Sequence, residues 1–262
     1  MQQPVVVYQM GMVGSTSIVE ALTAIGLPVF HLHALNPAHL MTVVEKHQEK
    51  GIPLPAHIHQ AFKVKKKLLD EGKPVKIITA VRDPIARNIS AYFQALRFFR
   101  ALKPEFEEGE LETMMTEFLN KYQHHLPLIW FDREIKEVLG LDIYNYPFPK
   151  NDGVQRIRET KIDVLLLKAE TADHLKIAVI REFLQIPEFS LKAKNVGKKK
   201  AYAHYYKPFL ERIQLPAAYL DKMYGSRYVQ HFYSPEEIHE FRKRWTGGRM
   251  SSERNEAAQN VS

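Results

Sequence analysis

Short apolar runs alternate along the chain with longer segments in which apolar residues recur every three or four positions. The short runs are rich in Val and Ile, as buried strands are, and the longer segments have the period of amphipathic helices. Strands that alternate with helices predict a parallel sheet covered on both faces. The expected fold is therefore a three-layer, P-loop-like α/β fold. The predicted strands are the run that starts at Val5, then Pro28–His33, Val75–Val81 and Asp163–Lys168.

The predicted helices follow these strands and dominate the second half of the chain. Asn36 suits the N-cap of one helix, and Pro37 suits its first position. Prolines break the helical pattern at Gly51–Ala56 and Tyr144–Pro149. The predicted helices cover the segment around Ile18–Ile25, Pro37–Lys50, Gln60–Glu71, Pro84–Leu102, Glu110–Tyr122, Leu126–Leu139 and Ala172–Leu184, with two more after Tyr206.

The length and hydrophobic content suit one large α/β domain. The chain has 262 residues, of which 45% are hydrophobic, and a chain of this size can bury a sizeable core. We expect a single domain over residues 1–246, with a helical C-terminal part. The polar tail from Gly247, residues 247–262, has a composition that predicts disorder.

The first strand leads into a loop with the features of an anion-binding site. Gly11 and Gly14 allow tight turns, and the helix that follows presents unpaired N–H groups at its first turn. Ser15, Thr16 and Ser17 add hydroxyl groups at the same place. The loop lacks the spacing and the lysine of a kinase-type P-loop, which disfavours a P-loop kinase. A phosphate-binding loop is one interpretation, and a plain turn between strand and helix is the other.

The charge balance favours an anionic partner. The chain has 37 Lys and Arg against 30 Asp and Glu, a net charge of +7 and a pI near 9.3. Such a charge suits a nucleotide, a polyanion, an acidic membrane or a nucleic acid without choosing among them. The absence of cysteine excludes disulfides, a thiolate nucleophile and a Cys-ligated zinc site. No apolar run reaches membrane-spanning length and no signal peptide is recognisable, so we expect a cytoplasmic location.

A second anion site is predicted where the third strand ends. Arg82 leaves the strand, Asp83 suits the N-cap of the next helix, and Pro84 suits its first position. Ser90 lies about two turns further, a rise of ~10 Å, so an extended Arg82 side chain can lie alongside the first turns. A guanidinium, a hydroxyl and a helix N-terminus then converge on one anionic group. The alternative is that Arg82 pairs with Asp83 or caps a neighbouring helix, while Ser90 faces solvent.

Together, the two loops resemble those of the PAPS-dependent sulfotransferases. The segment Ala80–Phe93 looks particularly like the carbohydrate (heparan 2-O-type) members, and Met12–Ser17 is similar to their first loop except at its head. A third piece, Asn195–Tyr202, is similar to a motif of the bacterial capsular polysaccharide synthesis family, which is sulfotransferase-like. The resemblance runs in patches from Val5 to Tyr206.

The resemblance implies a nucleotide site and assigns residues to it. PAPS would be the co-substrate and PAP the product, with no metal. Arg82 and Ser90 would bind the 3′-phosphate, and Asn195–Tyr202 would close over the same side of the nucleotide, with Lys200 touching phosphate. The basic and aromatic residues around Tyr202 suit stacking on sugar rings or on bases equally. The residues implied at the 5′-phosphosulfate are Gly11, Met12, Gly14, Ser15, Thr16 and Ser17.

The head of the first loop departs from that family. The sulfotransferases usually have a lysine there, which stabilises charge on the bridging oxygen as the sulfuryl group leaves. This chain has Met12, and a thioether cannot take that role. Either another cation substitutes, with Lys63 and Lys65 as candidates, or the nucleotide binds while catalysis is slow or absent.

Two histidine pairs supply candidate general bases for the acceptor hydroxyl, a task that suits an imidazole with a pKa near 6.5. His57-x-His59 is expected to lead into the basic helix, and it resembles the His-x-His of the heparan 2-O-type enzymes, whose second histidine is the base. That resemblance points to His59. His31-x-His33 ends the second strand and makes His33 the other candidate. In an extended segment both members of a pair share one face. No carboxylate at ligand spacing accompanies the pairs, which disfavours a metal site. The second-choice bases are Asp132 and Glu134.

The sequence thus predicts a sulfotransferase that moves a sulfuryl group from PAPS to a hydroxyl, with a carbohydrate as the expected acceptor. One alternative is a catalytically silent protein that binds PAP or PAPS, which Met12 supports. Another is a nucleic-acid-binding protein driven by the basic surface. Under the sulfotransferase interpretation we expect neither a nucleic-acid partner nor a membrane span.

Overall fold

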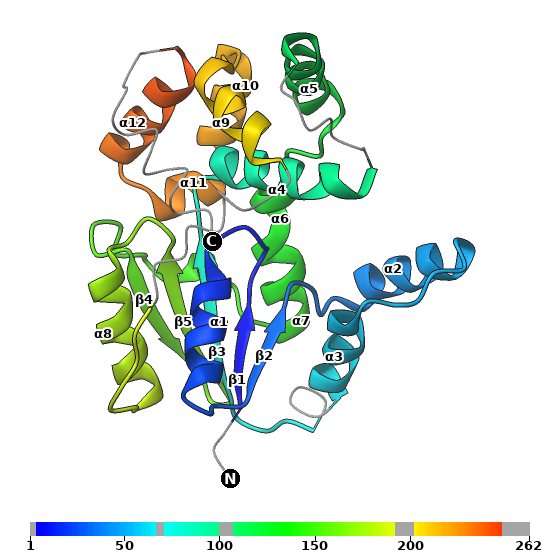
Figure 1. The fold of residues 1–262 in the computed structure, drawn as a ribbon. Helices are drawn as coiled ribbons and strands as arrows, with labels where there is room; N and C mark the ends of the chain where they lie inside the picture. Colours follow the sequence, from blue (N-terminus) through cyan, green and yellow to red (C-terminus); the bar gives the residue numbers. More distant parts are fainter. Residues whose placement is uncertain (1–3, 67–70, 100–106, 192–201, 248–262) are drawn as a thin grey trace. The chain divides into compact units, whose positions relative to one another are not determined.

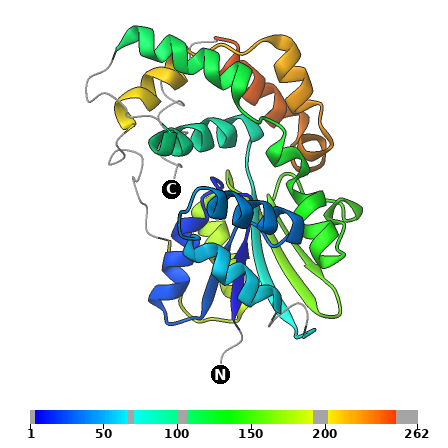
Figure 2. The same ribbon diagram turned by 90° about the vertical axis from the view of Figure 1, so that its right-hand side faces the viewer.

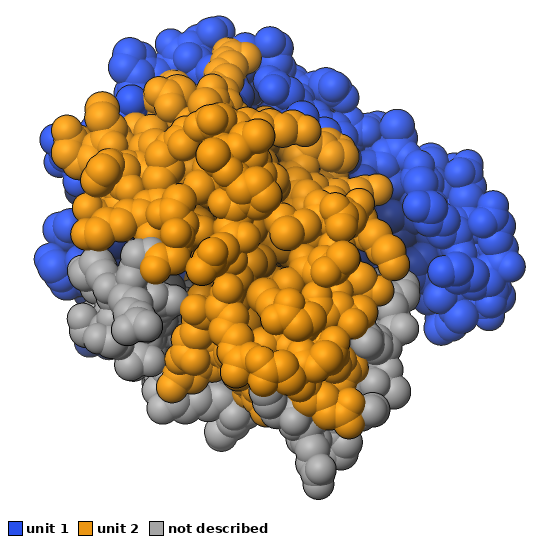
Figure 3. All heavy atoms as spheres, turned by 90° about the horizontal axis from the view of Figure 1, so that it is seen from above, with its two compact units in different colours: residues 1–11, 15–81, 129–192 blue, residues 12–14, 82–128, 193–262 orange. Residues whose placement is uncertain are grey.

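The computed structural model describes residues 4–66, 71–99, 107–191 and 202–247. It divides into two compact units, which Figure 3 colours separately. Unit 1 comprises residues 1–11, 15–81 and 129–192, and unit 2 comprises residues 12–14, 82–128 and 193–262. Within the described residues the chain passes between the units after Gly11, Gly14, Val81 and Leu128. Each unit is described by itself.

Unit 1 contains a five-stranded sheet in the order β2-β1-β3-β5-β4 (Figure 1). The pairs β1–β2, β1–β3 and β3–β5 are parallel, and β4 pairs antiparallel with β5. All four residues of β1 are buried because both faces of this central strand are covered. The predicted α/β class with a largely parallel sheet is confirmed. The strands are β1 Val5–Tyr8, β2 Val29–Leu32, β3 Val75–Val81, β4 Val154–Arg158 and β5 Ile162–Lys168.

Strand β4 is absent from the sequence prediction and makes the sheet mixed instead of wholly parallel. Of its five residues only Ile157 is buried. Its Gln and Arg residues hide the apolar signal, as is common in an edge strand covered on one face. The side chain of Arg156 forms an ion pair with Asp163 on β5, at 2.6 Å between Nη2 and Oδ2.

Helices flank the sheet of unit 1. Figure 2 shows α1 on one side of the central strands, with the π-helical turn η2 and α7 on the other. The chain enters α2 through Asn36, whose side-chain oxygen accepts hydrogen bonds from the backbone of Ala38 and His39, so the predicted N-cap is confirmed. The helical elements of this unit are α1 Ser15–Ala24, α2 Pro37–Glu49, α3 Ala56–Val64, η2 Phe131–Lys136, α7 Glu137–Leu139, the 3₁₀ turn η3 Ile143–Asn145 and α8 Asp173–Leu184.

Helix α3 begins four residues earlier than the sequence pattern indicates. It starts at Ala56 and not at Gln60, with Pro55 at its N-cap. The sequence predicts a rigid connector at the prolines that precede this helix. In the structure the last of them, Pro55, is the N-cap of α3, and its φ of −60° suits that position. As a result, His57 and His59 are helical. Two residues on a helix are about 200° apart, so the two imidazoles do not share a face.

Unit 2 is helical. Its core contains an aromatic cluster in which Phe93 contacts Tyr202, Tyr206 and Phe209, with ring centroids 5.0–5.6 Å apart. Where the sequence predicts two helices after Tyr206, the structure has three short ones beyond α9. The helices are α4 Pro84–Phe99, α5 Glu108–Lys121, the start of α6 Leu126–Trp130, α9 Ala203–Arg212, α10 Ala217–Tyr224, α11 Arg227–Phe232 and α12 Pro235–Trp245.

Glu134 fixes the segment that joins β2 to α2. It is fully buried on η2, and its Oε2 accepts hydrogen bonds from Tyr8 Oη (2.7 Å), Leu35 N (2.8 Å) and Asn36 N (2.9 Å). Burial, followed by the charge of Glu134, raises the pKa of the Tyr8 hydroxyl, which keeps it protonated as a donor. A carboxylate with these three donors has a structural role. Its proposal as a second-choice base is not supported by its surroundings.

None of the helices in the described ranges combines the length and the apolar character that a bilayer crossing requires.

Candidate functional site

The topology directs attention to the exits of β1 and β3. The chain leaves β1 and returns to the sheet at β2 on one side, whereas β3 joins β1 on the other side. Ligands of open α/β sheets bind outside the carboxyl ends of the strands at such a switch point. The residues that follow the two strands are Gln9 and Arg82. Both predicted anion-binding loops therefore begin at this switch point.

The loop after β1 has an unusual backbone. Gly11 and Gly14 have φ values of +77° and +80°, and Met12 has φ +59°. A left-handed conformation is unfavourable for a residue with a side chain and costs about 1 kcal/mol or more. Strain of this kind is often found where a loop holds a ligand. Helix α1 starts directly after Gly14, so the loop adjoins a helix N-terminus, the end of a helix that favours anions.

A buried polar cluster lies beneath the start of α1, formed by Gln9, Ser15 and His31. Ser15 Oγ lies 3.0 Å from His31 Nε2 and accepts a hydrogen bond from Gln9 Nε2, which is also 3.2 Å from His31 Nε2. Gln9 and Ser15 are 1% and 4% exposed. The sequence assigns Ser15 to the anion, but its side chain points to His31. Among the predicted hydroxyls, Thr16 is exposed and Ser17 is half-buried.

Burial, followed by the nearby His33 and His57, lowers the pKa of His31 to about 4. His31 is therefore neutral near pH 7, and its Nε2 and the Ser15 hydroxyl can share one proton in a hydrogen bond. No sequence signal separates His31 from His33, because both belong to the same His-x-His pattern. The difference between them arises from burial.

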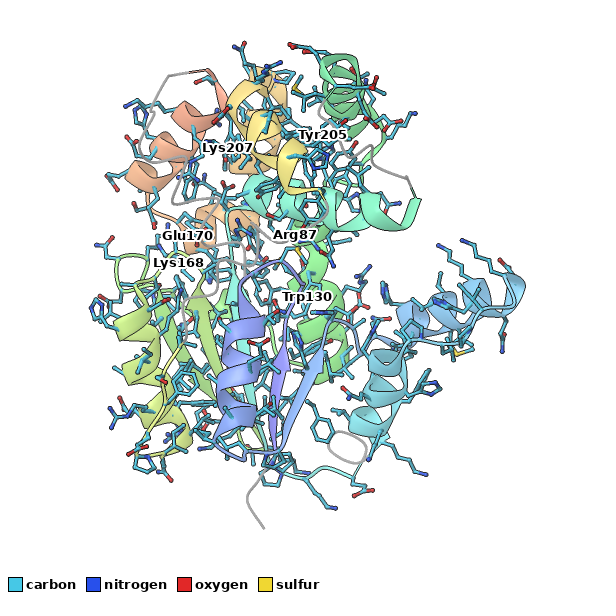
Figure 4. The ribbon with its side chains drawn as sticks, viewed as in Figure 1. Arg87, Trp130, Lys168, Glu170, Tyr205 and Lys207 are labelled. Atoms are coloured by element: carbon cyan, nitrogen blue, oxygen red, sulfur yellow. The ribbon has the colours of Figure 1, made fainter. Side chains whose placement is uncertain are left out.

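His33 is held in one orientation beside the loop. Its Nδ1 donates to the carbonyl oxygen of Gln9 (3.0 Å), and its own carbonyl accepts from the indole N–H of Trp130 (3.1 Å), which Figure 4 labels. A Cβ on Gly11 would lie 3.8 Å from Nδ1, so the imidazole lies against the loop backbone. The ring is exposed. With its proton on Nδ1, the Nε2 atom of neutral His33 is a proton acceptor.

The two histidines of α3 differ in their surroundings. The ring of His57 lies 6.4 Å from that of His33, centroid to centroid, and burial, followed by His47, lowers its pKa. His59 is exposed on a different side of the helix. The structure thus brings His31, His33 and His57 together and leaves His59 out of that group. In the ranges that the structure describes, no three His, Asp or Glu side chains are arranged to hold a metal ion.

Arg82 and Ser90 meet as their spacing predicts. Arg82 is 7% exposed, and its Nη1 donates to the Met12 carbonyl (2.9 Å) and to Ser90 Oγ (3.3 Å). Ser90 is buried and lies 3.1 Å from the hydroxyl of Tyr206. Arg82 forms no ion pair with any residue of the described ranges. The alternatives of an Arg82–Asp83 pair and a solvent-facing Ser90 are therefore wrong.

Several unit 2 residues hold this arrangement in place. Tyr228 Oη accepts from the backbone N–H of Arg82 and lies 2.9 Å from its carbonyl. Asp83 Oδ1 accepts from Ile85 N (3.0 Å) and from the hydroxyl of Tyr224 (3.1 Å), as its predicted capping role requires. Burial raises the pKa of the Asp83 carboxyl. Tyr206 and Tyr228 have no recognisable sequence signal beyond their aromatic character.

A second guanidinium, that of Arg87, is also buried on α4 (labelled in Figure 4). Its Nη1 donates to Asn88 Oδ1 (3.1 Å) and to Tyr122 Oη (3.3 Å). Burial lowers its pKa. Arg87 thus adds positive charge near Arg82, with which it interacts electrostatically, on the helix that also carries Ser90.

The remaining predicted site residues lie elsewhere. Tyr202 is 3% exposed and packs against Phe93 in the core of unit 2, with ring centroids 5.6 Å apart. Lys200 lies outside the described residues. Lys63 is exposed on α3, Lys65 is half-buried just after it, and Asp132 is half-buried on η2.

The lowered pKa of His31 predicts an acid-sensitive component of stability. Between about pH 6.5 and pH 4 the unfolded chain binds a proton at this histidine and the folded chain does not. The free energy of unfolding should therefore fall as the pH decreases through this window, by on the order of 1 kcal/mol because the ring is partly exposed. NMR titration should give His31 a midpoint near 4, and urea unfolding of His31→Gln should show a weaker pH dependence. A His31 midpoint near 6.5 would contradict this account.

Comparison with known proteins gives one match. The model of the NKWYS family, whose description reads "Putative capsular polysaccharide synthesis protein", matches residues 110–234. No curated protein and no solved structure matches the chain. The matched range contains the third sequence motif but neither Gly11–Ser17 nor Arg82–Ser90. It thus relates the second half of the chain to a family named for capsular polysaccharide synthesis.

Proposed function

We propose that the protein is a sulfotransferase that moves a sulfuryl group from PAPS to a hydroxyl of a carbohydrate. The observation that carries this proposal is the buried guanidinium of Arg82, which has neutral oxygens as partners and no carboxylate within ion-pair distance in the described residues. Asp83 interacts with this cation only through the longer-range effect of its charge. A buried cation whose hydrogen-bond partners are neutral is costly, and a bound anion would offset that cost. Ser90 supplies a hydroxyl beside it, as a 3′-phosphate would require.

The loop after β1 is assigned to the 5′ side of the nucleotide. Its glycines and the left-handed Met12 shape the backbone before α1, and the first turn of that helix offers N–H donors together with Thr16 and Ser17. Ser15 contributes through its backbone and through its bond to His31. Lys200 and Tyr202 are retained from the resemblance as residues near the 3′-phosphate.

The reaction balances with one proton acceptor. The acceptor oxygen forms a bond to sulfur while the bond from sulfur to the bridging phosphate oxygen breaks, which releases PAP. The hydroxyl proton passes to a base, and we assign His33 to this task. Its Nδ1–H is donated to Gln9 O, which leaves Nε2 as the proton-accepting nitrogen of the ring, and the ring is exposed beside Gly11. His59, the base that the resemblance implies, lacks comparable positioning.

The assignment of a carbohydrate acceptor is supported by the family match. The description of that family concerns capsular polysaccharide synthesis, and its model covers residues 110–234. A polysaccharide offers many hydroxyls of the kind that sulfuryl transfer uses.

One alternative function is favoured by a specific observation. Met12 occupies the loop position where the resembled enzymes have a lysine, and its main chain is bound through its carbonyl to Arg82. A thioether gives no charge stabilisation to the leaving oxygen. The alternative is a protein that binds PAP or PAPS without transferring the sulfuryl group.

The nucleotide assignment predicts selective stabilisation by PAP. A ligand at 100 times its Kd raises the free energy of unfolding by about 2.7 kcal/mol. PAP should therefore raise the melting temperature at concentrations at which ADP and AMP, which lack the 3′-phosphate, do not. Ser90→Ala should weaken PAP binding about tenfold, because it removes one hydrogen bond to a charged group.

Ser190→Ala is the matched control, because Ser190 is exposed and distant in sequence from both loops. It should bind PAP as the wild type does. Equal stabilisation by PAP and ADP would show that the 3′-phosphate assignment is wrong.

Substitution of Met12 distinguishes the enzyme from the silent binder. If the wild type is an enzyme, Met12→Lys should change the rate of sulfuryl transfer by less than about tenfold. If the wild type instead lacks activity because this cation is missing, Met12→Lys should raise the rate about 10²–10³-fold, the usual contribution of one donor at a developing negative charge. An increase of that size from an undetectable wild-type rate would support the silent binder. Met12→Leu, which adds no charge, serves as the control, and the rate is measured as transfer of labelled sulfate to polysaccharide.

The assignment of the base predicts that His33→Asn lowers the turnover number about 10²–10⁴-fold while PAP still binds. The control is His174→Asn, at an exposed position of α8, which should retain activity. A comparable loss in His59→Asn with normal turnover in His33→Asn would transfer the role to His59.

A further inference from the structure

Helix α3 presents two chemically different sides. Ile58, Ala61 and Val64 are buried on one side and belong to the core of unit 1. On the opposite side lie exposed residues spaced three, four and seven positions apart, the spacing of a single helical face. We call this face the outer stripe; it consists of His59, Phe62 and Lys63 on α3 and of Lys66 in the helical turn just after it.

The outer stripe carries positive charge without local compensation. Lys63 and Lys66 form no ion pair with any residue that the structure describes. Residues 51–66 contain no Asp or Glu. Some exposed cations elsewhere have carboxylate partners, such as Lys121 with Glu117 at 3.3 Å. Figure 4 shows nitrogen-ended side chains that project from α3.

An exposed aromatic ring lies among these cations. Phe62 is 39% exposed, although the apolar side of the helix is already occupied by core contacts. A flat apolar ring between positive charges suits a ligand with an apolar face and negative groups, such as a sugar ring in an acidic polymer. The stripe from His59 to Lys66 is ~10 Å long along the helix, so a polymer can contact several of its side chains at once.

We propose that the outer stripe binds a negatively charged polysaccharide. The inference rests on the proposed function in one respect: the bound polymer is the acceptor of the sulfuryl group. Lys63 and Lys66 neutralise its acidic groups, Phe62 packs on a sugar ring, and His59 is a binding residue of this stripe. This gives the two histidines of α3 separate tasks, because His57 lies beside His33 and His59 faces the polymer.

The same features favour a soluble polymer over a membrane surface. A helix that binds a bilayer inserts a broad apolar face into it. The apolar face of α3 is buried in its own unit, and the outer stripe offers only one apolar side chain. Charge complementarity therefore carries the interaction, and its strength should fall with salt.

The test measures direct binding of the full chain to polygalacturonate, which has one carboxylate on each sugar, by calorimetry at low and at physiological salt. The double variant K63E/K66E should bind at least about tenfold more weakly, because two attractive contacts become repulsive. The matched control is K222E/K243E, which makes the same charge change at two exposed lysines of unit 2. It should retain the wild-type affinity. The melting temperatures of both variants verify folding.

Four results would overturn the inference: equal affinity of K63E/K66E and wild type, an equal loss in both double variants, equally tight binding of neutral dextran, or tighter binding of phosphatidylserine vesicles than of polygalacturonate. Since the assay contains no nucleotide, it is independent of the PAP measurement. Absence of PAP binding together with the predicted loss in K63E/K66E would remove the sulfotransferase assignment and support the stripe as a polysaccharide site.

Discussion

The candidate site residues of unit 2 are arranged around a buried positive charge, that of Arg82. The guanidinium of Arg82 is almost wholly removed from water, yet its partners in the described residues are a carbonyl oxygen and a hydroxyl, which carry only partial charges. Hydrogen bonds to such neutral groups offset only part of the free-energy cost of removing the guanidinium from water. The surroundings restrict the residue further, because Tyr228 bonds to its backbone on both sides. The position of this cation is therefore fixed by both its side chain and its backbone.

The polar cluster of unit 1 shows the opposite solution. Gln9, Ser15 and His31 are buried or half-buried, and His31 avoids the cost of a buried charge by a lowered pKa. The cluster therefore stays neutral while it fixes the first residue of α1. Arg82 is thus a buried charge, whereas the cluster beneath the loop is a set of hydrogen bonds between neutral groups. Met12, which lies between Gln9 and Ser15 in the sequence, has a left-handed backbone conformation and is therefore strained.

The sequence predicts most of the central fold because buried parallel strands have a strong signal. The runs at β1, β3 and β5 consist mostly of buried residues and are rich in Val, Ile and Leu. Asn36 and Asp83 are caps with side-chain hydrogen bonds in the structure. Strand β4 is not predicted from the sequence because it is buried on one face only and carries Gln and Arg. The start of α3 is predicted too late because prolines are as common in a connector as at a helix boundary.

The sequence predicts only those contacts of the candidate site that are made between residues close together in the chain. Arg82 and Ser90 share one strand-to-helix turn, so their contact follows from helix geometry. His31 and Tyr206 depend on residues 16 and 116 positions away, and Glu134 depends on residues at least 98 positions away. No local pattern encodes such contacts. The pairing of His57 with His59 fails for the same reason, since their relation depends on where the helix begins.

The route of the chain through the two units has a mechanical consequence. Three of the four covalent links within the described residues, after Gly11, Gly14 and Val81, lie in the two loops that leave β1 and β3. No single backbone cut would separate the units, and neither is a contiguous segment that could be produced alone. Each of these two loops therefore contributes backbone to both units. A change of backbone conformation in either loop is thus passed along the peptide chain to both units at once.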